Sequence, residues 1–374
     1  MNKSHRPGLY IHVPFCRTKC PYCDFYSVTS GEHHTGAWLK ALEQEVQFYQ
    51  NRFAAFDSIY IGGGTPSLLN REEISGLMDC LSGRFRFFSD TEVTLEANPD
   101  DITPEKLSLY RRIGINRISL GVQSFQENEV AFMQRRHTAK EAERALEFIR
   151  SAGFTNIGID LIYGFEGQTE SGWIQTLERA LRFRPEHLSC YQMTIEEGTP
   201  FGKMKAEGKL RSLGEEEEGR FFSLTSSFLK ERGYIHYEIS NFARGPEYFS
   251  RHNQKYWNHT PYLGLGPAAH SFQNGVRWWN VRSLQAYCQM LARKKTPVED
   301  REVLTREQLR LEALYLGFRT EEGVDFDIVR EFPGAEGVLA ELEKSGLIVL
   351  KKGRVAPTQQ GFLVADSLPI LFVS

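Results

Sequence analysis

Residues 15–25 read Phe-Cys-Arg-Thr-Lys-Cys-Pro-Tyr-Cys-Asp-Phe, which places Cys16, Cys20 and Cys23 on one short loop. Three thiolates on such a loop can point at a common centre, and cysteine thiolates are the ligands that hold iron–sulfur clusters. Three cysteines leave one iron of a four-iron cube without a protein ligand. The loop therefore predicts a cluster with an open iron to which a chelating cofactor can bind.

A structural zinc site is the alternative interpretation of this loop. Zinc requires four ligands in closed tetrahedral geometry and usually takes them from two Cys-x2-Cys pairs. The chain has no second pair, so His12 or Asp24 would have to supply the fourth ligand. The other cysteines, Cys80, Cys190 and Cys288, are scattered through apolar segments, where a cysteine usually serves as a small apolar side chain.

Short β-type runs alternate with helical patterns between residues 9 and 195, which is typical of parallel strands joined by crossover helices. We expect six strands, over residues 9–13, 58–61, 92–96, 117–122, 156–162 and 187–194, and helices that include 36–49, 104–113 and 139–152. This order predicts an α/β fold with a partial (β/α)6 TIM-type barrel.

Residues suited to chemistry fall where these strands end. Cys16 follows the first strand, Gly62–Gly64 follow the second, Glu96 ends the third, Gln123 follows the fourth and Asp160 lies near the end of the fifth. In such barrels the loops at the carboxyl ends of the strands carry the active site. We therefore expect these residues to meet at one mouth of the barrel.

The pattern changes after the barrel, and we predict three parts: the barrel over residues 1–240, a segment over 241–290 that packs on it, and a domain over 291–374. The middle part is rich in aromatic residues, Gly, Pro and Asn. The last part combines helices with a hairpin and predicts a small winged-helix-like α+β domain; its elements are expected at 305–316, 338–344, 347–350 and 354–357.

Charge and hydropathy argue against nucleic-acid binding and against a membrane-spanning helix. The chain has 45 basic and 48 acidic residues, so no overall basic field favours nucleic acid, and Lys351, Lys352 and Arg354 are too few to make the last domain a DNA reader. No stretch approaches the ~20 apolar residues of a membrane-spanning helix. The first apolar run, Leu9–Phe15, is too short for a secretory signal, so we expect a cytoplasmic location, where thiols stay reduced.

Further motifs accompany the cysteine loop at the strand ends: Gly62–Ser67, Glu96–Pro99, Ser119–Phe125, Asp160–Gly164 and Tyr191–Glu196. Together with Cys-x3-Cys-x2-Cys after a first strand reading Leu-Tyr-Ile-His-Val, they resemble the radical SAM superfamily, and within it the coproporphyrinogen III oxidase-like group. The resemblance covers most of the chain. It implies a [4Fe-4S] cluster on the three loop cysteines and S-adenosyl-L-methionine at the open iron.

The resemblance also implies which residues surround the S-adenosylmethionine. Glu96 and the backbone of Gly63, Gly64 and Thr65 are expected near its amino group, and Arg135 near its carboxylate, with Arg136 as the alternative. Gln123 and Asp160 are expected near the ribose, and Tyr10 is a further neighbour of the cofactor.

Residues 251–257 read Arg-His-Asn-Gln-Lys-Tyr-Trp, which resembles the His-Asn-x-x-Tyr-Trp motif of the heme chaperones in this group. The resemblance implies that the protein binds heme and delivers it to client haemoproteins such as respiratory enzymes. We expect His252 as the axial ligand on a partly exposed loop, with Tyr256 and Trp257 against the macrocycle. His259 and His270 are the competing ligands.

The alternative function is that of an oxygen-independent coproporphyrinogen III oxidase, which performs radical SAM oxidative decarboxylation. Such enzymes carry a further cysteine where this chain has Phe25, and a longer segment than the 15 residues that precede Cys16. Both departures favour the chaperone. The sequence leaves open S-adenosylmethionine cleavage, homodimerisation and peripheral contact with a membrane.

Overall fold

Parallel strands form the centre of a 12-stranded sheet in the computed structural model, which describes residues 6–29 and 35–373. The six predicted strands are confirmed and lie side by side in the order β1 (Gly8–Val13), β4 (Phe56–Gly63), β5 (Phe87–Ala97), β6 (Arg117–Gln123), β7 (Ile157–Tyr163) and β8 (His187–Gln192). Each pairs with the next in parallel. The predicted α/β class with a partial barrel is therefore confirmed.

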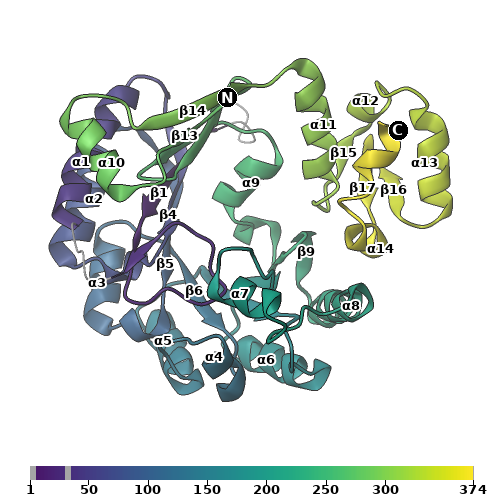
Figure 1. The fold of residues 1–374 in the computed structure, drawn as a ribbon, viewed down its shortest axis with the longest axis horizontal. Helices are drawn as coiled ribbons and strands as arrows, with labels where there is room; N and C mark the ends of the chain where they lie inside the picture. The colour runs from purple at the N-terminus through teal and green to yellow at the C-terminus, as the bar shows by residue number, and fades with distance from the viewer. Residues whose placement is uncertain (1–5, 30–34, 374) are drawn as a thin grey trace.

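Helices that follow the strands cover the outside of the sheet (Figure 1). They are α1 (Thr35–Tyr49), α2 (Arg71–Arg84), α3 (Pro104–Arg112), α4 (Glu127–Phe132), α5 (Ala139–Ser151), α6 (Glu170–Arg182) and α8 (Glu215–Glu231). Helix α5 shows why they form: Thr138 and Glu141 make a capping box at its start, and Ala142, Leu146 and Ile149 are buried on one face.

Side chains alternate along β1, the first strand of the barrel. Leu9, Ile11 and Val13 are fully buried in the apolar core, whereas Tyr10 contacts Tyr60 of the neighbouring strand β4 at 6.3 Å between ring centroids. Successive side chains of a strand point to opposite faces, so the apolar set packs against the helices and the polar aromatic set points into the barrel.

The 241–290 segment differs from the predicted covering layer, because much of it extends the sheet. Strand β11 (Tyr262–Leu265) pairs in parallel with β1, and β12 (His270–Gln273), β13 (Val276–Asn280) and β14 (Val298–Val303) continue the sheet in antiparallel fashion. Glu45 of α1 fixes this extension by accepting hydrogen bonds from Gly266 N at 2.8 Å and Asn280 Nδ2 at 2.6 Å. One strand of the predicted 291–374 part, β14, therefore belongs to the large sheet.

Helix α9 (Arg251–Trp257) lies against the amino ends of the barrel strands. Its Lys255 Nζ is 2.7 Å from Asp57 Oδ1 on β4, and its Arg251 N donates to Glu92 Oε1 on β5 at 3.0 Å. A Cβ on Gly8, the first residue of β1, would lie 2.8 Å from His252 Nδ1. The helix therefore closes the end of the barrel that is opposite to the cysteine loop.

The C-terminal domain has its own apolar core and lies beside the barrel (Figure 1). A three-stranded sheet of β15 (Val324–Asp325), β17 (Arg354–Pro357) and β16 (Ile348–Lys351) packs with α11 (Arg306–Gly317), α12 (Phe326–Val329), α13 (Ala335–Lys344) and α14 (Gln359–Leu363). Arg277 of β13 pairs with Glu312 of α11 at 2.8 Å, which ties the domain to the large sheet. Within residues 6–29 and 35–373, no helix has the length and apolar character that a membrane span requires.

Candidate functional site

The cysteine loop begins directly after β1, at the carboxyl end of the barrel. Strand β2 (Phe15–Cys16) pairs with β3 (Val28–Thr29), so the loop closes on itself. Cys16, Cys20 and Cys23 all line a cavity of about 590 Å³. Thr65 Oγ1 donates a hydrogen bond to Cys16 Sγ at 3.4 Å. Burial raises the pKa of the Cys23 thiol, and the neighbouring thiols of Cys20 and Cys16 raise it further. The structure therefore brings the three predicted thiols to one cavity.

Most of the other predicted cofactor residues line the same cavity. They are Gly63, Gly64, Thr65, Glu96, Gln123, Arg135 and Asp160. Tyr10 is the exception among them, because it lies deeper in the barrel, where its hydroxyl is 3.0 Å from His12 Nδ1. The predicted convergence of residues from five strand ends on one mouth is what the geometry shows.

Two carboxyl groups lie at the inner wall of the cavity. Glu96 accepts from Tyr60 OH at 2.8 Å and Gly63 N at 3.1 Å, and burial raises its pKa to about 7. Asp160 accepts from Ser119 Oγ at 3.1 Å, and burial raises its pKa too. A cationic amine that enters the cavity favours the ionised form of such groups, so the pair is suited to hold an ammonium.

The glycines after β4 are required by the protein's own packing. Gly63 has φ +108°, and a Cβ there would lie 2.6 Å from the His12 ring. A Cβ on Gly64 would lie 2.6 Å from the carbonyl oxygen of Phe15, and Gly64 N donates to Val13 O at 2.7 Å. From the sequence, we expect the backbone of these glycines to lie close to a ligand. In the structure, the groups that lie close to them belong to the first strand and the cysteine loop.

The two neighbouring arginines point in different directions. Arg135 lines the cavity and donates to Asn98 Oδ1 at 2.6 Å and to Cys20 Sγ at 3.3 Å. Arg136 does not line it and pairs with Asp100 at 2.8 Å. The geometry therefore supports Arg135, rather than Arg136, as the cation of this cavity.

Gln123 has the backbone geometry and the free acceptor expected of a binding residue. Its φ is +67°, in the left-handed region that non-glycine residues rarely adopt, and strained positions of this kind cluster at functional sites. Its Oε1 is buried and has no hydrogen-bond partner among the described residues. Buried polar atoms are usually paired, so a ligand donor such as a hydroxyl fits here.

The donor set as a whole fits a thiolate-bound cluster with a chelating cofactor. Three soft thiols lie on one wall, and an arginine, two carboxyl groups and an unpartnered amide oxygen lie around them. Within the described ranges, no three His, Cys, Asp or Glu side chains are arranged to hold a single metal ion. Further residues that the strand alternation places inward also line the cavity, namely Tyr60, Asn98, Ser119, Tyr191 and Met193. Sequence reasoning gave none of them a role, although all but Tyr60 lie in the motifs at the strand ends.

The structure places His252 away from any loop, and that part of the prediction is wrong. It lies on α9 with 1% of its surface exposed, and burial lowers its pKa to about 3. Nδ1 is 3.3 Å from Ser58 Oγ and Nε2 is 2.9 Å from Tyr256 OH, so both ring nitrogens are engaged. Of the competing histidines, His259 pairs with Glu312 at 3.1 Å, and His270 stacks on Trp279.

Two stretches of the chain match known protein families. Residues 10–180 match the radical SAM superfamily, and residues 304–364 match the HemN C-terminal domain. The first range contains the cysteine loop and the strands from β1 to β7, and the second contains most of the C-terminal domain.

Similar proteins cover nearly the whole chain. "Heme chaperone HemW" of Bacillus subtilis (strain 168) is 35% identical in an alignment that covers 96% of this chain and 97% of the relative. The protein of the same name from Escherichia coli (strain K12) is 37% identical over 70% of this chain and 69% of the relative. The solved structure of coproporphyrinogen III oxidase (HemN) from Escherichia coli, described as a radical SAM enzyme, superposes with a TM-score of 0.85 at 26% identity, over 99% of this chain and 90% of that one.

Proposed function

The chain belongs to the HemW family of the radical SAM superfamily, and from that membership we propose that it is a heme chaperone, which binds heme and delivers it to client haemoproteins. The observation that carries the proposal is the likeness to the Bacillus subtilis heme chaperone over 97% of that protein's length. Respiratory enzymes as clients, the cytoplasmic location, a homodimer and peripheral membrane contact stay predictions.

Cys16, Cys20 and Cys23 are proposed to hold the [4Fe-4S] cluster, since they are the only cysteines that line the cavity among the described residues. When bound, the cluster would supply an open iron to which S-adenosylmethionine can coordinate and a redox centre that can pass it an electron. Thr65 and Arg135 donate to two of the sulfurs, and hydrogen bonds of this kind tune the potential of such clusters.

The remaining cavity residues are proposed to bind S-adenosylmethionine by complementary charge. Glu96 faces the amino group, Arg135 the carboxylate, and Gln123 and Asp160 the ribose hydroxyls. Glu96 is held by Tyr60 and Gly63, and Arg135 by Asn98, so their positions are fixed before the cofactor arrives. Preorganised groups bind without a further entropic cost of ordering.

We expect Arg135→Ala to weaken S-adenosylmethionine binding by about ten- to a hundredfold, because a charge-assisted bond to a carboxylate contributes ~1.5–3 kcal/mol. Arg136→Ala is the matched control, because Arg136 pairs with Asp100 outside the cavity and should leave the affinity unchanged. The measurement is the change that S-adenosylmethionine makes in the EPR spectrum of the reduced cluster, titrated in each variant. Equal effects of the two substitutions would contradict the assignment.

A second function is favoured by the TM-score of 0.85 to coproporphyrinogen III oxidase. It would be the radical SAM oxidative decarboxylation of a porphyrinogen. Against it, the position where the oxidases are expected to carry a further cysteine is Phe25, whose side chain is 70% exposed at the cavity. A phenylalanine offers neither a thiol nor a proton to the reaction, so this chain lacks that group.

An anaerobic incubation with coproporphyrinogen III, S-adenosylmethionine and a reductant separates the two functions. As a chaperone, the protein should give no decarboxylated porphyrin by chromatography and mass spectrometry. The Phe25→Cys variant should give none either, because function requires an assembled site rather than one residue. Harderoporphyrinogen or protoporphyrinogen from the wild-type chain, together with 5′-deoxyadenosine, would move it to the enzyme subgroup.

A further inference from the structure

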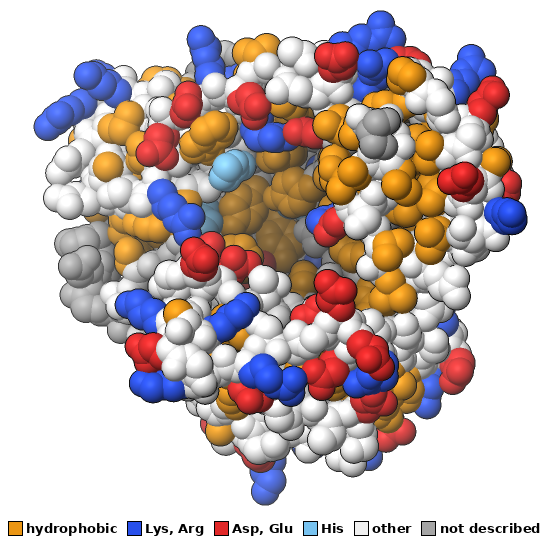
Figure 2. All heavy atoms as spheres, turned by 45° about the vertical axis from the view of Figure 1, so that its right-hand side comes forward, with side chains coloured by type: hydrophobic (Ala, Val, Ile, Leu, Met, Phe, Trp, Pro, Cys, Tyr) orange, Lys and Arg blue, Asp and Glu red, His pale blue; other side chains and the backbone are white. Residues whose placement is uncertain are grey.

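A second cavity of about 480 Å³ lies between α9 and the C-terminal domain, at the barrel end opposite to the cysteine loop. Figure 2 shows the hollow on the face where the two parts of the molecule meet, with apolar side chains in its depth. The cavity is lined by Trp257 and its neighbours on α9, by β9 (Ile235–Glu238), and by the turn between β16 and β17. Ligand cavities in proteins usually measure about 300–1,000 Å³, so this one can take a small organic molecule.

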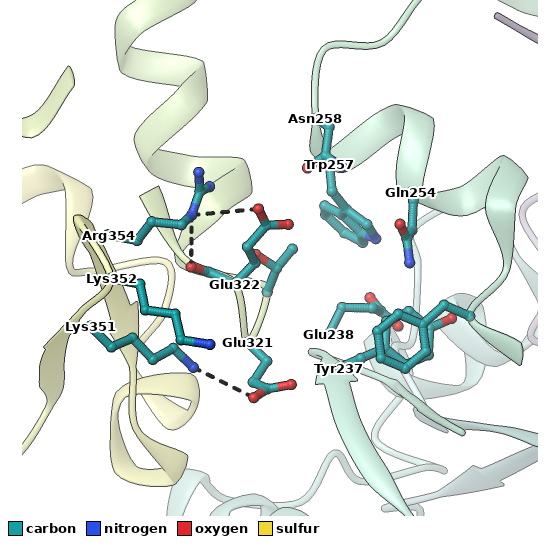
Figure 3. Close-up of a pocket in the computed structure, with 12 residues that line it drawn as sticks. Tyr237, Glu238, Gln254, Trp257, Asn258, Glu321, Glu322, Lys351, Lys352 and Arg354 are labelled. Carbon is teal, nitrogen blue, oxygen red and sulfur yellow. Dashed lines mark hydrogen bonds and ion pairs between the residues drawn. The ribbon is translucent and has the colours of Figure 1, made fainter. Parts of the chain in front are cut away.

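One wall of this cavity is aromatic. Tyr237 and Phe249 stack with their ring centroids 4.1 Å apart and an interplanar angle of 13°, and the indole of Trp257 stands beside them (Figure 3). Trp257 Nε1 is buried and has no hydrogen-bond partner in the described part of the chain. Glu238, 1% exposed, also keeps an unpartnered buried oxygen, Oε1, in this lining. An aromatic face with unpaired polar atoms suits a flat ligand that carries polar groups.

The opposite wall has a net positive charge, because its three cations outnumber the two carboxylates of Glu321 and Glu322. Lys351, Lys352 and Arg354 project from the β16–β17 turn toward the cavity (Figure 3). Lys351 pairs with Glu321 at 3.5 Å in an exposed and therefore weak ion pair. Arg354 lies 3.6 Å from Glu322 and also donates to the backbone oxygens of Glu322 at 3.0 Å and Gly323 at 2.6 Å, so it is held in place. Lys352 forms no ion pair or hydrogen bond within residues 6–29 and 35–373. A ligand carboxylate therefore meets one unpaired cation, Lys352, and one whose present partner can be exchanged, Lys351.

We propose that this cavity is where the protein holds the porphyrin, with the macrocycle against Trp257 and the propionates on the β16–β17 turn. The inference rests on the proposed heme-chaperone function and adds the location of the ligand and the means of its recognition. The flat apolar macrocycle of the porphyrin is complementary to the aromatic wall, and its two propionates are complementary to the cations of the opposite wall. Burial raises the pKa of Glu238 to about 7, so the deepest carboxyl of the lining does not oppose the propionates with a full charge.

The same helix then serves two purposes through two faces. His252 and Tyr256 are four residues apart, lie on the barrel side and hold α9 in place, while Trp257 lies on the cavity side. Among the residues that the structure describes, no histidine, cysteine or methionine lines the cavity. The porphyrin is therefore held by its face and its carboxylate edge rather than by a strong axial ligand, which suits a protein that must release it.

The test compares hemin with its dimethyl ester, in which both propionates are blocked. Wild-type protein should bind hemin at least about tenfold more tightly than the ester, because the ester cannot form charge-assisted bonds. The double variant Lys351→Gln/Lys352→Gln should lose this preference and bind both compounds as the wild type binds the ester. Lys344→Gln on α13, outside the cavity lining, is the matched control and should keep the preference.

A second pair of variants tests the aromatic wall. Trp257→Leu should weaken hemin and its ester alike, whereas Trp279→Leu, which lies on β13 outside the cavity lining, should weaken neither. Circular dichroism checks that each variant is folded. Heme uptake by the wild type with unchanged affinities in all cavity variants would overturn the location and leave the chaperone function standing. Absence of heme uptake by the wild type would overturn both.

Discussion

Replacing Cys16, Cys20 or Cys23 by alanine abolishes the iron–sulfur cluster, which is the largest effect that we expect from any single substitution. The wild-type chain, reconstituted anaerobically, should contain about four irons and show broad brown absorption, because three thiolates can hold a cube with one open iron. Each thiol lines the cavity at the carboxyl end of the barrel, and two of them accept hydrogen bonds from cavity residues. Removing one leaves two neighbouring irons open and the cluster unsupported.

The remaining cysteines provide the matched controls for this experiment. Cys190 is 2% exposed on β8, and Cys80 and Cys288 lie half-buried on α2 and on α10 (Leu284–Ala292), outside the cavity lining. Alanine at any of these positions should leave the iron content and the absorption unchanged. Loss of the cluster in one of these three variants would show that the ligand set is wrong.

Lys255→Met should lower the free energy of unfolding by about 3–5 kcal/mol, the usual cost of removing one partner of a buried ion pair. Lys255 Nζ lies 2.7 Å from Asp57 Oδ1, and both side chains are less than a tenth exposed. Without the lysine, Asp57 stays buried on β4 without a hydrogen-bonded cation, and only the charges of Arg251 and Arg6 still favour its ionised form. Helix α9 would therefore lose a buried polar attachment to the barrel.

Urea unfolding measures this effect, followed by the fluorescence of the tryptophans. Lys205→Met, at an exposed position on α7 (Pro200–Ala206), is the control and should change stability by less than about 0.5 kcal/mol. The double variant Asp57→Leu/Lys255→Met should recover most of the loss, because two well-packed apolar groups can replace a buried pair. A shift for Lys255→Met no larger than that of the control would contradict the role assigned to the pair.

The barrel could be predicted from the sequence because its signals are local and periodic. Short β-type runs that alternate with helical patterns placed all six barrel strands, and the helix expected over 139–152 is α5, Ala139–Ser151. The sheet extension was missed because β11 and β12 are short and lie among glycines and turns. Their place in the sheet depends on distant partners, such as the hydrogen bonds of Glu45 with Gly266 and Asn280.

The candidate site could also be predicted only in part. In any barrel with this strand order, the strand ends bring Cys16, Glu96 and Asp160 together, so their convergence could be predicted from the topology. The direction of a side chain could not be predicted in this way. Arg135 and Arg136 are neighbours in sequence, but Arg135 points toward Cys20 and Arg136 toward Asp100.

The surroundings of His252 could not be predicted for a related reason. The segment around it is rich in residues that break regular structure, a composition that favours a loop in which His252 is exposed. The structure forms a short helix there, and a helix places residues four apart on one face. His252 and Tyr256 therefore turn together into the barrel. Ligation of heme iron by His252 stays a prediction from the sequence; it would require Nε2 to leave the Tyr256 hydroxyl and is the alternative to the porphyrin site proposed beside Trp257.

A hemin titration of the cluster-loaded wild-type protein, followed by its Soret band under anaerobic conditions, tests the central claim most directly. A heme chaperone should take up one heme per chain with a saturable change in the Soret band, keep its iron–sulfur absorption, and convert none of the heme to product. Absence of saturable uptake, or binding that occurs only as the cluster is lost, would contradict the claim that this chain carries heme and cluster together.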